Sequence, residues 1–455
     1  MVHLLNKNLH FIGIGGIGMC GLAELLYNSG CRVTGSDLQE GSEISRLKKL
    51  GIPICIGHDP AHLDQKTDIV VYSSAIKKDN VELQEAKNRS LPVIHRGEAL
   101  AEMMRLKQGI VVAGSHGKTT TTAFLASVFF SAGKSPTVVA GGRLDLFQST
   151  ARLGNSKWFI AESDESDGSF HHLFPELTVL TNIDDDHLDF YGSLVEIKKN
   201  FYDFLKKIPF YGAVIACGDC KNVREVLGGH FSSKLYRYGF SKRNDFVLKK
   251  EKSHYTVYYK SEKWGQFETP LKGDYNALNA LGALVCAWLA GLKKGDIFKG
   301  LKDFKGVKRR REFKGEWKDC LFYDDYAHHP TELEALLSSL KEEFKDRRVV
   351  ALFQPHRYTR FKNCWARFLT CFSQADQLFV LPVYPAGEKS LKSFNSSAFV
   401  KKTQHPSVQL LDEKSCISVL SKELKEGDLL ITLGAGSVYR YGEVLLSYLK
   451  KTSRG

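Results

Sequence analysis

The chain has 455 residues, 43% of them hydrophobic, and a formal net charge of +13 at pH 7. This length exceeds what one hydrophobic core supports and predicts about three domains. There is no apolar run of about 18 residues or more and the first residues lack a signal-peptide pattern, so we expect a cytoplasmic protein without membrane insertion.

The charge and the cysteines narrow the class further. A basic chain suits nucleic acid or a polyanionic small substrate, but its basic residues are scattered without an aromatic-interleaved stripe. We therefore favour a nucleotide-phosphate site and expect no nucleic-acid partner. The ten cysteines show no paired spacing, which favours a reducing compartment over a disulfide framework.

The first predicted strand, residues 9–12, runs into Gly13-x-Gly15-x-x-Gly18. A helix is expected from about Met19, and a second strand over residues 32–35 ends at Ser36-Asp37. This βαβ opening has the spacing of a dinucleotide fingerprint. The loop requires only a pyrophosphate at a helix N-terminus, so NAD and a nucleotide sugar both remain open.

The second segment begins near Gly109, where an apolar strand leads into SHGKTTTT, residues 115–122. The loop supplies glycines for close backbone approach, Lys118 for phosphates and the Thr119 hydroxyl for Mg²⁺ at a helix start. It is shorter than the G-x-x-x-x-G-K-[ST] pattern, because Val112 stands where that pattern has its first glycine.

Acidic side chains follow two further strands of the same expected sheet. Glu162 follows the strand at residues 158–160 and is a candidate Mg²⁺ ligand, and the strand at 178–180 runs into TNIDDDHLD, which contains His187. Ligands of α/β sheets bind at the carboxyl ends of strands, so these groups are expected near Lys118 and Thr119.

The third segment alternates strands at residues 320–323, 348–353, 377–383 and 428–433 with helical stretches such as 331–344. Strand–helix alternation throughout predicts an α/β fold with a parallel, doubly wound sheet in each segment. DDYAHHPTE and QPHRYTR each follow a strand. Arg357 and Arg360, three apart, are expected on one helical face, where they would bind a carboxylate or phosphate bidentately.

Nine motifs in order resemble those of the Mur ligases over nearly the whole chain: HFIGIGGIGM, GSHGKTTTT, ESDESDGSF, TNIDDDHLDFYG, GDYNALNA, GVKRR, DDYAHHPTE, FQPHRYTR and YPAGE. Within that family they are most similar to the branch that joins L-alanine to UDP-N-acetylmuramate, the first peptide step of peptidoglycan precursor synthesis. The resemblance also accounts for the shortened phosphate loop.

The resemblance implies a Rossmann-like UDP-sugar domain (residues 1–106), a central P-loop ATPase-like α/β domain (107–308) and a Rossmann-like amino-acid-binding domain (309–455). It implies ATP and Mg²⁺, transfer of the γ-phosphoryl group to the lactyl carboxylate, and attack of the alanine amine on the acyl phosphate. The implied ATP-binding residues are Gly114, Ser115, His116, Gly117, Lys118, Thr119, Thr120, Asn276, Asn279 and Arg310. The implied UDP-sugar residues are Gly15, Gly16, Ile17, Gly18, Asp37, His58, Ser73 and Ser74. The implied amino-acid-binding residues are Tyr326, His328, His356, Arg357 and Arg360. The implied Mg²⁺ ligands are Thr119, Glu162 and His187. The implied catalytic residues are Lys118, Glu162, His187, His328, Arg357 and Arg360.

Some points stay open at this stage. The base that deprotonates the alanine amine is His187 or His328. Tyr275 stands where related ligases have His, and no lysine carbamate is predicted because the corresponding stretch is near residues 200–202. The rivals are a nicotinamide dehydrogenase, a nucleic-acid or other non-enzymatic nucleotide-binding protein, and the ligase that attaches a tripeptide to the same UDP-sugar. A monomer and a homodimer are both compatible with the sequence.

Overall fold

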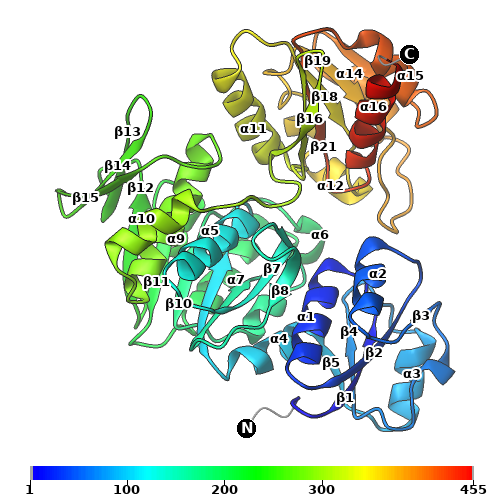
Figure 1. The fold of residues 1–455 in the computed structure, drawn as a ribbon, viewed down its shortest axis with the longest axis vertical. Helices are drawn as coiled ribbons and strands as arrows, with labels where there is room; N and C mark the ends of the chain where they lie inside the picture. The colour runs from blue at the N-terminus through cyan, green and yellow to red at the C-terminus, as the bar shows by residue number, and fades with distance from the viewer. Residues whose placement is uncertain (1–3, 453–455) are drawn as a thin grey trace. The chain divides into compact units, whose positions relative to one another are not determined.

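The computed structural model describes residues 4–452 and contains three β-sheets with helices against them (Figure 1). The chain divides into two compact units. The first runs to Asp184 and includes Val195–Pro270 and Leu278–Val307, while the second holds Asp185–Leu194, Leu271–Ala277 and the chain from Lys308 onward. Within the described part, none of the helices combines the length and apolar composition needed to cross a membrane.

The N-terminal sheet is parallel and has the order β3-β2-β1-β4-β5. Its strand order reverses between β1 and β4, and such a switch point is where open α/β sheets bind ligands. The predicted βαβ opening is confirmed, with the helix starting two residues earlier than expected. The bounds are β1 Asn8–Ile12, α1 Ile17–Asn28, β2 Arg32–Asp37, α2 Ser42–Lys49, β3 Ile54–Ile56, η1 Pro60–His62, β4 Ile69–Tyr72, α3 Val81–Asn88, β5 Val93–His95 and α4 Arg96–Met104.

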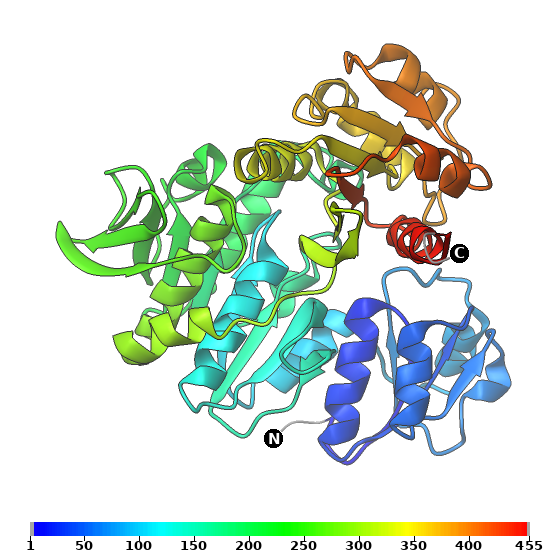
Figure 2. The same ribbon diagram turned by 45° about the horizontal axis from the view of Figure 1, so that its top comes forward.

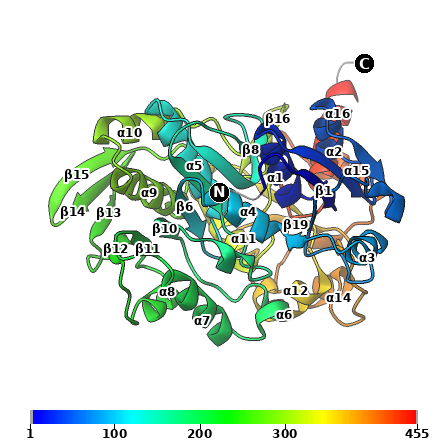
Figure 3. The ribbon, with the colours of Figure 1, turned by 90° about the horizontal axis from the view of Figure 1, so that it is seen from below.

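The central sheet has the order β15-β14-β13-β12-β11-β10-β6-β9-β7-β8. Figure 3 shows α5, α9 and α10 on one side of its strands and α7 and α8 on the other. The strands are β6 Gln108–Ala113, β7 Thr137–Leu144, β8 Ser149–Arg152, β9 Trp158–Glu162, β10 Leu177–Leu180, β11 Ala213–Cys217, β12 Lys234–Gly239, β13 Phe246–Lys250, β14 Tyr255–Tyr259 and β15 Glu262–Phe267. The helices are α5 Lys118–Ser131, η2 Ser169–His172, α7 Leu194–Leu205, α8 Lys221–Val226, α9 Asp274–Leu289 and α10 Lys294–Lys302.

The C-terminal sheet has the order β16-β17-β21-β18-β19-β20, and Figure 2 shows it in yellow to red with helices on both faces. Separate apolar clusters fill the two faces, one including Leu337 of α11 and the other Leu445 of α16. The strands are β16 Glu312–Trp317, β17 Cys320–Asp325, β18 Val349–Phe353, β19 Gln377–Val380, β20 Val408–Leu410 and β21 Leu429–Leu433. The helices are α11 Pro330–Glu343, α12 Tyr358–Asn363, α13 Trp365–Phe368, α14 Ser396–Lys402, α15 Cys416–Glu423 and α16 Tyr439–Thr452, and α6 Leu188–Tyr191 belongs to the same unit.

The expectation of a parallel sheet in each segment was wrong at the edges of two sheets. β8 pairs antiparallel with β7, β14 pairs antiparallel with both β13 and β15, and β16 pairs antiparallel with β17. These pairs are joined by short connections, which suffice for antiparallel neighbours, whereas parallel neighbours need a long crossover. The strands that lead into the phosphate loop and the acidic motifs beside it, β6, β9 and β10, pair only in parallel with their neighbours.

Candidate functional site

The phosphate loop lies between β6 and α5, and two of its glycines have conformations that other residues rarely adopt. Gly114 has φ +133° and Gly117 has φ +79°. A Cβ on Gly114 would lie 2.2 Å from Thr181 Oγ1, and one on Gly117 would lie 2.5 Å from Asn279 Oδ1. Because both steric space and φ require glycine, the loop backbone can pass close to a ligand at the start of α5.

The lysine and threonine of this loop meet acidic groups from the neighbouring strand. β6 lies between β9 and β10, so all three strands belong to one sheet, as the sequence predicts. Thr119 Oγ1 donates to Glu162 Oε1 (2.8 Å), and Glu162 Oε2 accepts from Gly141 N–H (2.6 Å). Lys118 Nζ donates to Gly114 O (2.7 Å) and lies 2.6 Å from Glu165 Oε1.

Burial and ion pairing together set the charges of Lys118 and Glu165. Glu165 is 4% exposed, and burial raises its pKa to about 7 against the attraction of Lys118. Burial also acts to lower the pKa of Lys118, but Glu165 and Glu162 together raise it above its ordinary value. Lys118 is therefore a cation at neutral pH. The hydroxyl and carboxylate oxygens of Thr119 and Glu162 are the hard ligands that Mg²⁺ prefers, so these residues fit the expected ion.

Ser115 and His116 connect the phosphate loop to the residues after β10 through hydrogen bonds. Asp184 N–H donates to Ser115 Oγ (2.9 Å), and His116 N–H donates to Asn182 Oδ1 (2.9 Å). His116 Nε2 lies 3.0 Å from Asp184 Oδ2. Thr120, the next loop residue, is buried in the first turn of α5.

The glycine loop of the first domain donates a backbone hydrogen bond to Asp37, the acidic residue predicted at the same site. Gly15 N–H donates to Asp37 Oδ2 (2.8 Å), and α1 begins at Ile17 with Gly16 as its N-cap. His58 Nδ1 lies 3.1 Å from Ser36 Oγ, so the residue before Asp37 contacts another predicted UDP-sugar residue.

Sequence reasoning missed Arg96, which joins the glycine loop to the acidic motif after β9. Its guanidinium forms ion pairs with Asp164 and Asp167, and a Cβ on Gly18 would lie 2.9 Å from Arg96 Nη1. Burial acts to raise the pKa of Asp164, but Arg96 lowers it to about 2. Ser74 donates to the same Asp167, whereas Ser73 Oγ accepts from Ala75 N–H. A signal was available, because Arg96 opens a helix directly after a strand.

In the second unit, the expectation that Arg357 and Arg360 share one helical face was wrong. α12 begins at Tyr358, and Arg357 precedes it as the N-cap with φ +66°. Arg357 contacts Glu388 (2.7 Å) and Asp189 (3.1 Å), whereas Arg360 Nε donates to Asp186 Oδ1 (3.1 Å). The two guanidiniums therefore bind different carboxylates.

The aromatic and imidazole groups of this unit lie together beside Arg360. The rings of His328 and His356 are 6.2 Å apart, and those of His328 and Tyr326 are 5.3 Å apart. Burial, reinforced by Arg360, lowers the pKa of His328 to about 3 and that of His356 to about 4. His328 Nδ1 lies 3.0 Å from Tyr326 O, so the neutral ring donates Nδ1–H to that carbonyl and presents Nε2 as an acceptor.

The remaining predicted residues are divided between the units. His187, the N-cap of α6 with φ +56°, belongs to the second unit and lies 3.6 Å from Asp186 Oδ2. Arg310 lies 5.2 Å from the Tyr326 ring centroid. Asn276 donates to Lys272 O (3.0 Å) in the second unit, whereas Asn279, in the first, lies where a Cβ on Gly117 would come within 2.5 Å of its Oδ1.

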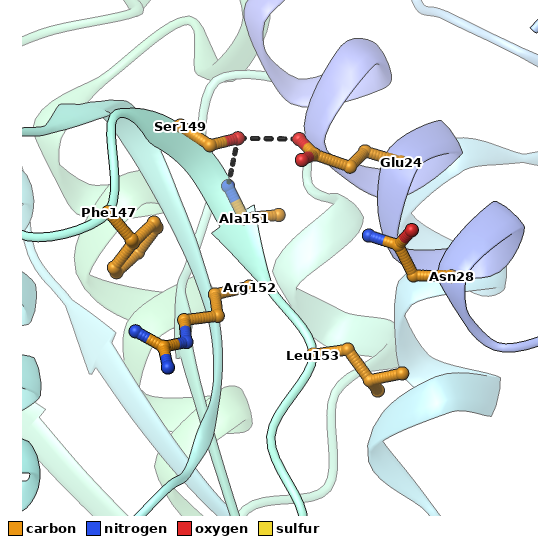
Figure 4. Close-up of a pocket in the computed structure, with 7 residues that line it drawn as sticks. All are labelled: Glu24, Asn28, Phe147, Ser149, Ala151, Arg152 and Leu153. Atoms are coloured by element: carbon orange, nitrogen blue, oxygen red, sulfur yellow. Dashed lines mark hydrogen bonds between the residues drawn. The ribbon is translucent and has the colours of Figure 1, made fainter. Parts of the chain in front are cut away.

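A pocket of about 440 Å³ lies between α1 and β8 in the first unit (Figure 4). Figure 4 shows Ser149 hydrogen-bonded to Glu24 across it. None of the predicted site residues lines this pocket, whose lining residues are Glu24, Asn28, Phe147, Ser149, Ala151, Arg152 and Leu153.

Comparison with known proteins gives the same assignment along the whole chain. Residues 8–108 match the Mur ligase family catalytic domain, residues 112–287 the Mur ligase middle domain, and residues 309–436 the domain described as "Mur ligase, glutamate ligase domain". The chain is 45% identical to UDP-N-acetylmuramate--L-alanine ligase of Bdellovibrio bacteriovorus, covering 98% of this chain and 100% of that protein. It is 42% identical to the ligase of the same name from Geotalea daltonii, with 98% of each covered.

Solved structures agree in fold. UDP-N-acetylmuramate-alanine ligase MurC of Thermotoga maritima superposes with a TM-score of 0.82 at 27% identity, covering 98% of this chain and 99% of that one. A murein peptide ligase from Psychrobacter arcticus gives a TM-score of 0.77 at 26% identity, covering 97% and 98%.

Proposed function

The chain belongs to the Mur ligase family, and from this membership we propose that it joins L-alanine to the lactyl carboxylate of UDP-N-acetylmuramate with conversion of ATP to ADP and phosphate. The observation that carries the proposal is the meeting of Lys118, Thr119 and Glu162 at the carboxyl ends of β6 and β9. That arrangement supplies a cation for phosphate and oxygen ligands for a metal at one helix N-terminus.

Amide formation from a carboxylate needs activation, because the carboxylate is a poor electrophile and its oxygen a poor leaving group. Transfer of the ATP γ-phosphoryl group to the lactyl carboxylate gives an acyl phosphate, and attack by the alanine amine then releases phosphate. Lys118 offsets the charge on the phosphates. Thr119 and Glu162 of the first unit would hold Mg²⁺, which shields the negative charge of two anionic reactants when bound, and His187 as a further ligand stays a prediction.

The amino-acid chemistry falls to the second unit. Arg360 and Arg357 carry the positive charge that a carboxylate requires, and a ligand there would exchange with Asp186, Asp189 or Glu388. His328, with its pKa near 3, is neutral at physiological pH and a weak base. His187 is also predicted as a ligand of Mg²⁺, and a ring nitrogen that binds the ion cannot accept the proton as well, so whether His187 or His328 is the base stays a prediction.

We assign binding of the acyl donor, UDP-N-acetylmuramate, to the first domain. A nicotinamide site would leave the central phosphate loop without a role, whereas a UDP-sugar gives all three domains a substrate. Arg96, beside Gly18, adds a cation suited to an anionic ligand at the glycine loop.

We also propose Asn276, Asn279 and Arg310 at the nucleotide, the domain boundaries near residues 106 and 308, and a cytoplasmic location. Monomer or homodimer stays a prediction.

Phosphate release from ATP with each pairing of acyl donor and amine tests this function. UDP-N-acetylmuramate with L-alanine should give turnover, and the product should carry one alanine by mass. L-alanyl-γ-D-glutamyl-meso-diaminopimelate is the matched alternative amine, because the murein peptide ligases share the fold. Preference for that tripeptide would replace the proposal with its nearest rival. If calorimetry detected binding of NAD but no binding of the UDP-sugar, a nicotinamide dehydrogenase would become the better assignment.

A further inference from the structure

Glu82, in the first turn of α3, is fully buried although it is a carboxylate. Ser36 at the end of β2 donates to its Oε2 (2.6 Å). Its Oε1 lies 2.9 Å from His62 Nδ1 and accepts from Asp59 N–H (3.2 Å), both from the segment after β3. One side chain thus joins a helix, a strand end and a loop.

Two more imidazoles complete what we call the Glu82 cluster, namely Glu82, Ser36, His10, His58 and His62. His10 Nε2 from β1 lies 3.3 Å from Oε2, and His58 Nδ1 lies 3.4 Å from Oε1. Burial alone would raise the pKa of Glu82, but the hydrogen bonds from His10, Ser36 and His62 lower it to about 2. The carboxylate is therefore ionised and held by several donors, so replacing it leaves those donors without their anionic acceptor.

The cluster leads directly to the proposed UDP-sugar residues. The backbone carbonyl of Ser36 accepts from Gly13 N–H (2.9 Å) and Ile14 N–H (3.0 Å), the first residues of the glycine loop. The following residue, Asp37, accepts from Gly15 N–H through its side chain and from Gly57 N–H (2.8 Å) through its carbonyl. The end of β2 thereby holds the glycine loop on one side and the His58 segment on the other.

We propose that Glu82 is a positioning residue of the UDP-sugar site, which holds the end of β2, and with it the glycine loop, against the segment that carries His58. This inference rests on the proposed function. In this role Glu82 fixes the distance between two segments of the site. The glycine loop offers backbone N–H groups to a diphosphate, and the segment that carries His58 offers an imidazole. Its effect is confined to the uridine diphosphate part of the substrate, because none of the cluster residues belongs to the phosphate loop or to the second unit.

Glu82→Gln tests the proposal, since it keeps the shape and removes the charge. We expect the KM for UDP-N-acetylmuramate and the Kd for free UDP to rise about tenfold, with kcat and the KM values for ATP and alanine within about twofold of the parent. Asp68→Asn is the matched control. Asp68 accepts two hydrogen bonds from Asn8 (2.8 and 2.9 Å) at the amino edge of the same sheet, so its loss should lower the melting temperature without changing UDP affinity.

A second pair of variants decides the matter if Glu82→Gln does not fold. His62 is partly exposed, and Asn can place an amide donor where its Nδ1 lies. His62→Ala should weaken UDP binding and His62→Asn should restore it at equal melting temperature. Unchanged UDP affinity in folded Glu82→Gln, or in both His62 variants, overturns the inference. A parent that binds UDP yet makes no alanyl product refutes the proposed function alone, because UDP affinity still decides the role of Glu82.

Discussion

Thr119 Oγ1 donates a 2.8 Å hydrogen bond to Glu162 Oε1, so a side chain in the first turn of α5 contacts the last residue of β9. The two are 43 residues apart in the chain, and they come together because β6 and β9 are parallel neighbours whose carboxyl ends share one edge. A hydroxyl and a carboxylate brought together beside Lys118 form the part of the site that most directly predicts Mg²⁺-dependent phosphoryl chemistry.

Glu162→Gln should raise the Mg²⁺ concentration needed for half-maximal ligation about tenfold, because a neutral amide is a weaker ligand for a hard cation than a carboxylate. The amide still contacts Thr119 and Gly141, so the fold should persist. Mg²⁺ titrations of the ligation rate provide the measurement. Glu176→Gln is the control, since Glu176 accepts from Gln108 (3.1 Å) at the amino edge of the same sheet. Superimposed titrations of Glu162→Gln and the parent would remove Glu162 from the metal site.

Lys118→Ala should lower kcat/KM for ATP by about 10² to 10³, because it removes a preorganised cation from the transferred phosphoryl group. It also leaves Glu165 buried without its cation, so some loss of thermal stability is expected. Lys107→Ala is the comparison, because Lys107 likewise donates to Thr137 (3.0 Å) and Ser156 O (2.9 Å) but outside the loop. Steady-state kinetics and melting curves on both variants separate the effects. A folded Lys118→Ala enzyme with parental kinetics would exclude the phosphate-loop assignment.

Arg360→Lys should raise the KM for alanine about tenfold despite the retained charge, because an ammonium cannot reproduce the planar donor pattern of a guanidinium. Arg348→Lys provides the control. Arg348 binds Asp428 through two nitrogens (3.0 and 2.7 Å) at the amino edge of the same sheet. That variant should lose stability and keep its kinetic constants. Equal kinetics in both variants would mean that Arg360 only anchors Asp186.

The acid sensitivity of the first domain should depend on Glu82. Its pKa in the folded chain is about 2, below the ordinary 4.5, so the ionised carboxylate stabilises the fold above pH 4.5, and this contribution is lost as the pH falls toward 2. The shift corresponds to about 3 kcal/mol. Glu82→Gln cannot titrate there, so the difference in stability between parent and variant should shrink as the pH falls below 4.5 toward 2. Melting temperatures of both proteins from pH 7 to pH 3 measure this difference, and a gap that does not narrow would contradict the ionised carboxylate.

Much of the phosphate site could be predicted from the sequence because its signals are local. Glycines next to Lys118 and Thr119 after an apolar strand specify a loop at a helix N-terminus, and Glu162 follows another strand of the expected sheet. The Arg357–Arg360 pair failed as a prediction, because helical spacing applies only inside a helix and Arg357 precedes α12 with a positive φ. The turn that causes this has no clear sequence signal.

The sequence by itself determined the family, the three α/β domains and the residue types of the phosphate loop, because these follow from hydrophobic alternation and motifs over short stretches. Only the tertiary structure decided which charges face one another. Glu165 meets Lys118, Arg96 meets Asp164 and Asp167, and Glu82 collects three histidines from β1 and the segment after β3. These pairings join residues about 20 to 70 positions apart in the chain, and strand order and register, rather than the local sequence around either partner, bring them within hydrogen-bond distance.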